Sequence, residues 1–206
     1  MRKGRALERH ANCLLTQNKE RNILGCKHYQ RNAKLQADCC GRWFTCRLCH
    51  DEACDHTISR HATKMMMCMA CALVQPVARL CARKGCNTTM GKYYCDVCKF
   101  WDNSPMRSLY HCAKCGICRV GKGIGYDYFH CDTCNTCISS SLQQRHQCTV
   151  NVLDKDCPVC DEYLFTSIHD TQIAACGHAY HSKCYKGHLV VVDHCPECSV
   201  LLLEDE

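Results

Sequence analysis

The chain has 206 residues, a formal net charge of +6, and 26 cysteines beside 13 histidines. Its hydrophobic content of 47% includes those cysteines, and without them only about a third of the chain is apolar. This composition excludes one large aliphatic core, so disulfides or metal ions must hold the fold together.

Two segments indicate the compartment. The N-terminal residues 1–10 are basic, but no apolar segment follows them, which argues against a secretory signal. The longest apolar stretch, residues 65–74, is too short to span a bilayer. We therefore expect a soluble protein of a reducing compartment with no membrane partner. In that setting, C-x2-C pairs interleaved with histidine are typical of zinc sites, and redox motifs are disfavoured because no βαβ pattern surrounds the pairs.

The first predicted element is a helix over Ala6–Gln17, inside a basic N-terminal segment. A first field of candidate metal ligands follows and runs from Cys26 to Cys86. Its members combine cysteine pairs with neighbouring histidines. They are Cys26, His28, Cys39, Cys40, Cys46, Cys49, His50, His56, Cys68, Cys71, Cys81 and Cys86.

A second field runs from Cys95 to Cys148, after which residues 150–156 form a short linker. Two central blocks of this field repeat the pattern H-C-x2-C-x2-C, which predicts stacked zinc knuckles on short β-hairpins. The candidate ligands are Cys95, Cys98, His111, Cys112, Cys115, Cys118, His130, Cys131, Cys134, Cys137, His146 and Cys148.

The third field reads C-x2-C-x15-C-x-H-x2-H-x2-C-x10-C-x2-C. This order is typical of a cross-braced RING finger, in which alternate ligand pairs share a zinc ion. The first ion would bind Cys157, Cys160, His181 and Cys184, and the second would bind Cys176, His178, Cys195 and Cys198. A helix is predicted from about Ser182 to Val190.

A closed structural zinc site takes four ligands. The three fields supply 24 cysteines and eight histidines, which suffice for about eight tetrahedral sites. Cys13 and Cys54 remain as spare thiols, although His61 or Cys54 could replace His56. The pairing of ligands within the first two fields stays open. Iron–sulfur clusters are the rival interpretation, but mixed Cys/His sets at these spacings favour zinc.

Zinc binding also changes the charge. Because the ligand is the thiolate, 24 ionised cysteines add 24 negative charges and eight ions add 16 positive ones. The formal net charge then moves from +6 to −2. Since the second field also lacks dense basic and aromatic interleaving, we do not expect nucleic acid to be a partner.

Three motifs carry a family resemblance. The first field, with Cys26-Lys27-His28-Tyr29 and Cys46-Arg47-Leu48-Cys49-His50, resembles the CHY-type zinc finger. The second field, which ends on His146-Gln147-Cys148, is similar to the CTCHY-type finger. With the third field in its place, the chain from about Gly25 to Ser199 resembles the CHY, CTCHY and RING-H2 family of E3 ubiquitin ligases.

The resemblance implies small, irregular zinc-stabilised modules with little regular secondary structure. They would be a basic segment at residues 1–20, a CHY finger at 21–88, a CTCHY finger at 90–154, a cross-braced RING finger at 155–199, and a short tail at 200–206. The implied protein works in nucleus and cytoplasm. It would bind a ubiquitin-conjugating enzyme and ubiquitin, while its N-terminal fingers recruit the protein substrate.

A RING ligase forms no covalent intermediate, so no catalytic nucleophile is expected. The resemblance places the conjugating enzyme on Val159, Leu189 and Pro196, with His188 competing with Leu189 for the helix position. Many active RING fingers carry Arg or Lys directly after the last zinc ligand, whereas this chain has Ser199. The alternative function is therefore a catalytically weak zinc-finger scaffold for protein interactions.

Overall fold

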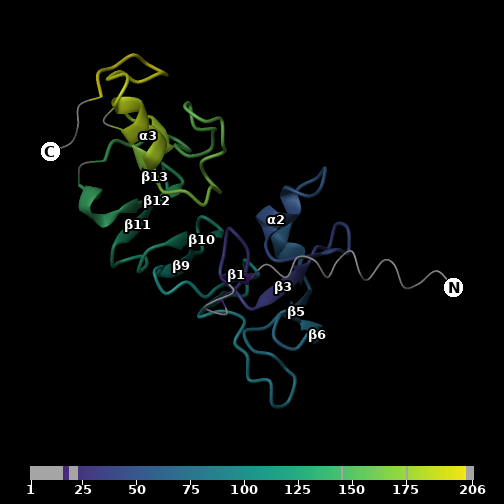
Figure 1. Ribbon diagram of the computed structural model, residues 1–206. Helices are drawn as coiled ribbons and strands as arrows, with labels where there is room; N and C mark the ends of the chain where they lie inside the picture. Colours follow the sequence, from purple (N-terminus) through teal and green to yellow (C-terminus); the bar gives the residue numbers. More distant parts are fainter. Residues whose placement is uncertain (1–15, 19–22, 145, 175, 203–206) are drawn as a thin grey trace. The chain divides into compact units, whose positions relative to one another are not determined.

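The computed structural model describes residues 16–18, 23–144, 146–174 and 176–202. Short strands, turns and a few helical turns make up the fold (Figure 1). The chain divides into two compact units, and the division along the sequence lies between Ser108 and Leu109. This sparse secondary structure confirms the predicted fold class of small Cys/His-rich modules.

In the described part of the first unit, short strands that all pair antiparallel are joined by turns and loops. Its elements are β1 (Thr16–Asn18), β2 (Ile23–Leu24), β3 (Ala33–Gln36), β4 (Trp43–Phe44), α2 (Arg47–Asp51), the 3-10 helix η2 (Arg60–Ala62), β5 (Met65–Cys68), β6 (Val74–Pro76), β7 (Tyr93–Cys95) and β8 (Phe100–Asp102).

The core of this unit lies on a sheet with strand order β4-β3-β5-β6. Along β5, Met66 and Cys68 are buried while Met65 and Met67 are half-buried, the period of two expected when one face covers a core. Trp101, on the hairpin β7–β8, is fully buried in the same core. Residues on both sides of the predicted boundary at 88–90 thus pack together.

The second unit is built from three hairpins and a helix. Its elements are β9 (Leu109–Cys112), β10 (Ile117–Val120), β11 (Tyr128–Cys131), β12 (Thr136–Ser139), the 3-10 helix η3 (Ser140–Leu142), β13 (Thr171–Ile173), β14 (Ala179–His181) and α3 (Ser182–Leu189).

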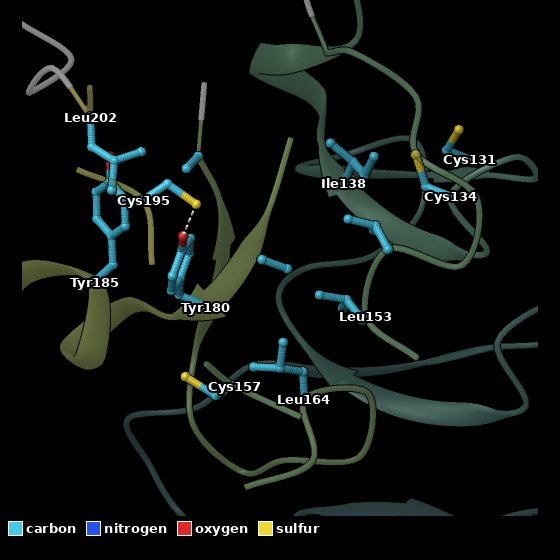
Figure 2. Close-up of a cluster of buried hydrophobic side chains, with 13 residues drawn as sticks. Cys131, Cys134, Ile138, Leu153, Cys157, Leu164, Tyr180, Tyr185, Cys195 and Leu202 are labelled. Carbon is cyan, nitrogen blue, oxygen red and sulfur yellow. Dashed lines mark hydrogen bonds between the residues drawn. The ribbon is translucent and has the colours of Figure 1, made fainter. Parts of the chain in front are cut away.

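One hydrophobic cluster joins the hairpin β11–β12 to the third field. Figure 2 shows Ile138 and Leu153 on one side of this cluster and Leu164 and Tyr180 on the other. The predicted linker at residues 150–156 contributes to it, because Leu153 is only 4% exposed. Burying aliphatic side chains from both segments makes them one packed body.

The hairpin turns that carry C-x2-C pairs share one backbone device. The residue directly after the second cysteine adopts a left-handed conformation, with φ between 46° and 68°, at Ala72, Lys99, Gly116, Asn135, Asp161 and Ser199. At Ala72, Gly116, Asp161 and Ser199 its amide donates to the carbonyl oxygen of the first cysteine, as from Ala72 to Cys68 at 2.8 Å, whereas the Lys99 amide donates to Asp96 at 3.4 Å. This bond closes the turn around the two thiols.

The helix predictions had different outcomes. The predicted helix at Ser182–Val190 is confirmed as α3, Ser182–Leu189. Of the predicted helix Ala6–Gln17, residues 6–15 lie outside the described residues. At Thr16 and Gln17 the prediction is wrong, because these residues belong to strand β1, which pairs with β2. Within the part of the chain that the structure describes, no helix has the length and hydropathy needed to cross a membrane.

The left-handed turns lead to a stability prediction. We expect Ala72→Gly to raise the free energy of unfolding by about 0.5–1 kcal/mol, because a left-handed backbone costs alanine roughly 1–2 kcal/mol and chain entropy offsets part of the gain. Denaturant unfolding of the zinc-loaded protein measures it. Ala70→Gly, in the same knuckle at an ordinary backbone angle, is the control and is expected to destabilise. Equal effects of the two substitutions would contradict the prediction.

Candidate metal centres

The thiols of the first field are grouped at the spacing of metal ligands. Cys26, His28, Cys46 and Cys49 have their ligand atoms within 4.8 Å of one another. The sulfur atom of Cys46 lies 3.6 Å from the sulfur of Cys26 and 3.6 Å from that of Cys49. His28 Nδ1 lies 3.4 Å from the same Cys46 sulfur. A zinc tetrahedron with Zn–S bonds of about 2.3 Å has sulfur–sulfur edges of about 3.8 Å. The set therefore fits zinc, whereas a disulfide needs sulfurs about 2 Å apart.

A second set interleaves with the first along the chain. Cys39, Cys40, His50 and His56 also lie within 4.8 Å of one another. Helix α2 connects the two sets, because its consecutive residues Cys49 and His50 face different sets. His50 is fully buried, and its Nε2 lies 3.3 Å from Cys39 Sγ. The first field is thus cross-braced through a helix of a single turn.

The third set of this field contains cysteine alone. Cys68 and Cys71 lie at the turn between β5 and β6, and Cys81 and Cys86 come from the loop that follows. The sulfurs of Cys71 and Cys81 are 3.5 Å apart, and those of Cys68 and Cys86 are 3.9 Å apart. These distances again match the edges of a zinc tetrahedron.

In the second field, the second repeat block supplies two ligands to a set of the first block. His130, the first residue of the second block, turns its Nδ1 towards the first block and lies 3.3 Å from Cys115 Sγ. Cys112 and Cys137 complete this set. The sequence pattern predicted knuckles but left the pairing open. In the structure, the outer two ligands of the second block, His130 and Cys137, join the two middle cysteines of the first block.

The second block forms its remaining set with the end of the field. His146 Nε2 lies 3.2 Å from Cys148 Sγ and 3.4 Å from Cys131 Sγ. Burial, and then the hydrogen bond with Cys131, raise the pKa of Cys134 to about 11. These four residues form one donor set between the hairpin β11–β12 and the chain that follows.

Four candidates of the second field divide between the two compact units. Cys95 and Cys98 lie at the turn of β7–β8 in the first unit, and the amide of Cys98 donates to Cys95 Sγ at 3.4 Å. His111 and Cys118 face each other across β9 and β10 in the second unit, with 3.9 Å between His111 Nδ1 and Cys118 Sγ.

The third field holds two interleaved sets. In the first, His181 Nδ1 lies 3.3 Å from Cys160 Sγ, and Cys184 is hydrogen-bonded to Cys160 and Cys157. In the second, His178 Nδ1 lies 3.6 Å from Cys176 Sγ and 3.4 Å from Cys195 Sγ, and Cys198 is hydrogen-bonded to both cysteines. Both sets have the composition expected of closed tetrahedral zinc sites.

The electrostatics of these sets favour a cation. Hydrogen bonds from Cys46 and Cys49 hold the pKa of Cys26 far below the ordinary thiol value. The bonds of Cys49 to Cys26 and Cys46, and then burial, raise the pKa of Cys49 far above it. One thiolate therefore prevents its neighbour from ionising. A divalent ion removes this conflict, since it allows all the thiols of a set to be deprotonated together.

Carboxylates hold the outer ring nitrogen of several candidate histidines. Asp51 Oδ1 lies 2.8 Å from Nδ1 of His50, whose Nε2 faces the thiols, and it also accepts the amide of Ile58 at 2.9 Å. In each field a lysine in turn binds such a carboxylate. The three chains of contacts are Lys27–Glu52–His28, Lys114–Asp132–His130 and Lys155–Glu197–His178. Outer contacts of this kind fix the tautomer and direction of a ligating imidazole.

Tyr180 supports a thiol in the same way. The side chain is fully buried, and its hydroxyl lies 2.9 Å from Cys195 Sγ, the dashed contact in Figure 2. Burial alone would raise the pKa of Cys195, but hydrogen bonds from Tyr180 and from the amides of Glu197 and Cys198 lower it to about 6. A thiol that ionises readily is a better zinc ligand.

Sequence reasoning did not identify these supporting residues. Some of them could have been found because they are next to a candidate histidine in the sequence: Asp51 directly follows His50, and Asp55 directly precedes His56. In the structure, Asp55 contacts Nδ1 of His56 at 2.9 Å. The others come from distant segments and had no local signal. Of the possible substitutes for His56, His61 binds the Val97 carbonyl oxygen at 3.0 Å. Cys54 accepts from Arg42 at 3.4 Å and is also hydrogen-bonded to Cys40, so it stays next to the second set.

The contact between Glu197 and His178 can be tested directly. We expect Glu197→Gln to weaken zinc binding at the second set of the third field by about ten- to a hundredfold, the usual effect of losing an outer carboxylate. NMR signals of His178, followed during titration with a chelator, report on this set alone. Asp193→Asn is the matched control, because Asp193 pairs with His194, which lies outside the donor sets. Equal chelator sensitivity of the two variants would contradict the proposed role.

Removal of metal tests the whole assembly. We expect a chelator to abolish the dispersed NMR spectrum and the cooperative thermal transition, because each structural zinc contributes on the order of 10 kcal/mol of apparent binding free energy. Metal analysis should find zinc without acid-labile sulfide. A sharp, unchanged thermal transition in EDTA would refute the interpretation that metal holds the fold.

The comparisons with known proteins agree with these donor sets. The sequence matches the CHY zinc finger family over residues 26–93. It is 47% identical to a BRUTUS-like zinc finger protein of Arabidopsis thaliana over 177 residues, which are 86% of this chain and 14% of that protein. It is 46% identical to an uncharacterized RING finger protein of Schizosaccharomyces pombe over 180 residues, 87% of this chain and 42% of that protein.

A rice relative is covered over most of its length. The E3 ubiquitin-protein ligase SRFP1 of Oryza sativa subsp. japonica is 42% identical over 187 residues, which are 87% of this chain and 69% of that protein. The chain thus spans only a small part of the BRUTUS-like relative but about two thirds of the rice protein. With its donor sets, its family match and this coverage, the chain belongs to the CHY zinc finger family.

Proposed function

We propose that the chain acts as a RING-type E3 ubiquitin ligase. Its third field would bind a conjugating enzyme charged with ubiquitin and promote transfer to lysines of a protein substrate. Relatives named E3 ubiquitin-protein ligases support the general activity. The observation that carries the RING assignment is the interleaving of the two donor sets at residues 157–198, with the short helix α3 between their ligand loops.

Exposed apolar residues border these loops. Val159 is 41% exposed between Cys157 and Cys160, and Pro196 is exposed between Cys195 and Cys198. Leu189, at the end of α3, is partly buried against the core, and His188 is engaged through Nε2 with the carbonyl oxygen of His194 at 2.8 Å. We assign Val159, Pro196 and the exposed edge of Leu189 to the conjugating enzyme, since apolar patches on loops are typical docking sites.

In this proposal the third field works by positioning. Cys157, Cys160, His181 and Cys184 would hold one zinc ion, and Cys176, His178, Cys195 and Cys198 the other. The ions supply structural rigidity, because four protein ligands leave no open position for water. The protein surface around them then holds the ubiquitin thioester close to a lysine and favours its attack, which is catalysis by proximity and orientation. No covalent step on this chain is required.

The docking residues make the proposal testable. We expect Val159→Ala and Pro196→Ala to abolish ubiquitin chain formation in an auto-ubiquitination assay with a panel of conjugating enzymes, while the zinc content stays unchanged. Val74→Ala is the control, because Val74 is 44% exposed on β6 of the first unit, outside the third field. Full activity of both docking variants, at normal zinc content, would reject this surface.

The alternative is a zinc-finger scaffold with weak ligase activity. Ser199 motivates it, because this short side chain is exposed in a left-handed turn where many active RING fingers carry Arg or Lys. The same assay separates the two functions, since a scaffold would discharge the charged conjugating enzymes hardly faster than they discharge alone. Recruitment of substrate by the first two fields and a location in nucleus and cytoplasm also belong to the proposal.

A further inference from the structure

Two hydrophobic clusters meet in the second unit. The larger one joins the hairpin β11–β12 to the third field, and the smaller one surrounds Tyr110, Cys112 and Cys115 of the hairpin β9–β10. Phe165, between the two zinc loops of the third field, packs against both clusters. This side chain therefore attaches the first repeat block of the second field to the predicted RING finger.

Arg119 on β10 covers the same ring. Its guanidinium carbon lies 4.8 Å from the centre of the Phe165 ring, a cation–π distance. One terminal nitrogen, Nη1, donates to the Phe165 carbonyl oxygen at 3.2 Å, and the other, Nη2, donates to Thr136 Oγ1 on β12 at 3.1 Å. A single side chain thus connects the hairpins β9–β10 and β11–β12 with the third field.

The chemistry of these contacts requires arginine. Thr136 is 2% exposed, so its contact with the guanidinium is buried. A planar guanidinium donates in two directions while its face stacks on an aromatic ring, and a lysine ammonium cannot do both. Arg119 Nη2 also approaches Cys115 Sγ at 4.0 Å, which brings the guanidinium to the edge of a candidate zinc set.

We propose that Arg119 and Phe165 form a latch that fixes the hairpin β9–β10 on the predicted RING finger, and that Arg119 is a positioning residue for ubiquitin transfer. The inference rests on the ligase function proposed above. With the latch closed, a conjugating enzyme docked at Val159 has a fixed distance and orientation relative to Lys114 and Lys122 of the hairpin β9–β10. With the latch open, the RING finger still binds the enzyme, and the shared donor set still ties β9–β10 to β11–β12. The hairpin can then turn on that tie, so its constant relation to the RING finger is lost.

Residual dipolar couplings of the zinc-loaded full chain test the latch itself. In the wild-type protein, amides of β9–β10 and of residues 155–199 should fit one alignment tensor. In Arg119→Gln and in Phe165→Leu they should need two. Arg119→Lys should behave as Arg119→Gln, because charge alone does not close the latch. The control Arg83→Gln removes an exposed arginine of the first unit and should leave one tensor. One tensor in all variants, or two in the wild type, would overturn the latch.

Two reactions then test positioning. Discharge of ubiquitin from the conjugating enzyme to free lysine needs only the RING surface, and we expect it to be unchanged in Arg119→Gln. Ubiquitin transfer to Lys114 and Lys122, mapped by mass spectrometry relative to Lys183 on α3, should fall on the order of tenfold or more. A parallel loss of discharge and transfer would mean general damage to the fold and would overturn the positioning role. If the wild-type protein does not discharge ubiquitin, both the ligase function and the positioning role of Arg119 are rejected. The residual dipolar couplings then still show whether the latch exists.

Discussion

Thiols packed 3.5–3.9 Å apart cannot all ionise without a counter-charge, and this constraint governs the rest of the structure. The opposite pKa directions of Cys26 and Cys49 express it within a single set. A divalent ion satisfies the constraint and at the same time joins segments that share few apolar contacts. Metal sets of this kind replace the large core that the composition excludes, because each bound ion contributes as much free energy as a small core does.

Ligands of different donor sets alternate along the chain, and this alternation links the zinc fingers to one another within each unit. Cys49 and His50, neighbours on α2, belong to different sets, and His130 serves the block that precedes its own. Each set therefore closes only when another segment is already near. The small hydrophobic clusters follow the same pattern, since Trp101 completes the core of the first field and Leu153 that of the third. We infer that metal binding and core formation are cooperative in each unit.

For a ligase, this construction has a functional meaning. The predicted RING finger is not suspended on a flexible linker, because residues 152 and 153, which lie in the predicted linker, are 3% and 4% exposed inside a core. A conjugating enzyme bound to exposed Val159 would thus be carried by the whole second unit. The polar contacts of Arg119 extend that unit to the first repeat block. Proximity catalysis depends on such rigid support, since small errors of position reduce the rate strongly.

The amino-acid sequence by itself determined the class of fold, the family and the helix that became α3, because ligand chemistry and spacing are local properties of the chain. It predicted knuckles on hairpins, and it left open which histidine serves which thiols. Only the tertiary structure decided that His130 turns back to Cys115, that Glu197 supports His178, and that Leu153 is core rather than linker. The physical reason is that these contacts join residues far apart in the chain, and their geometry exists only after the backbone has folded around the donor sets.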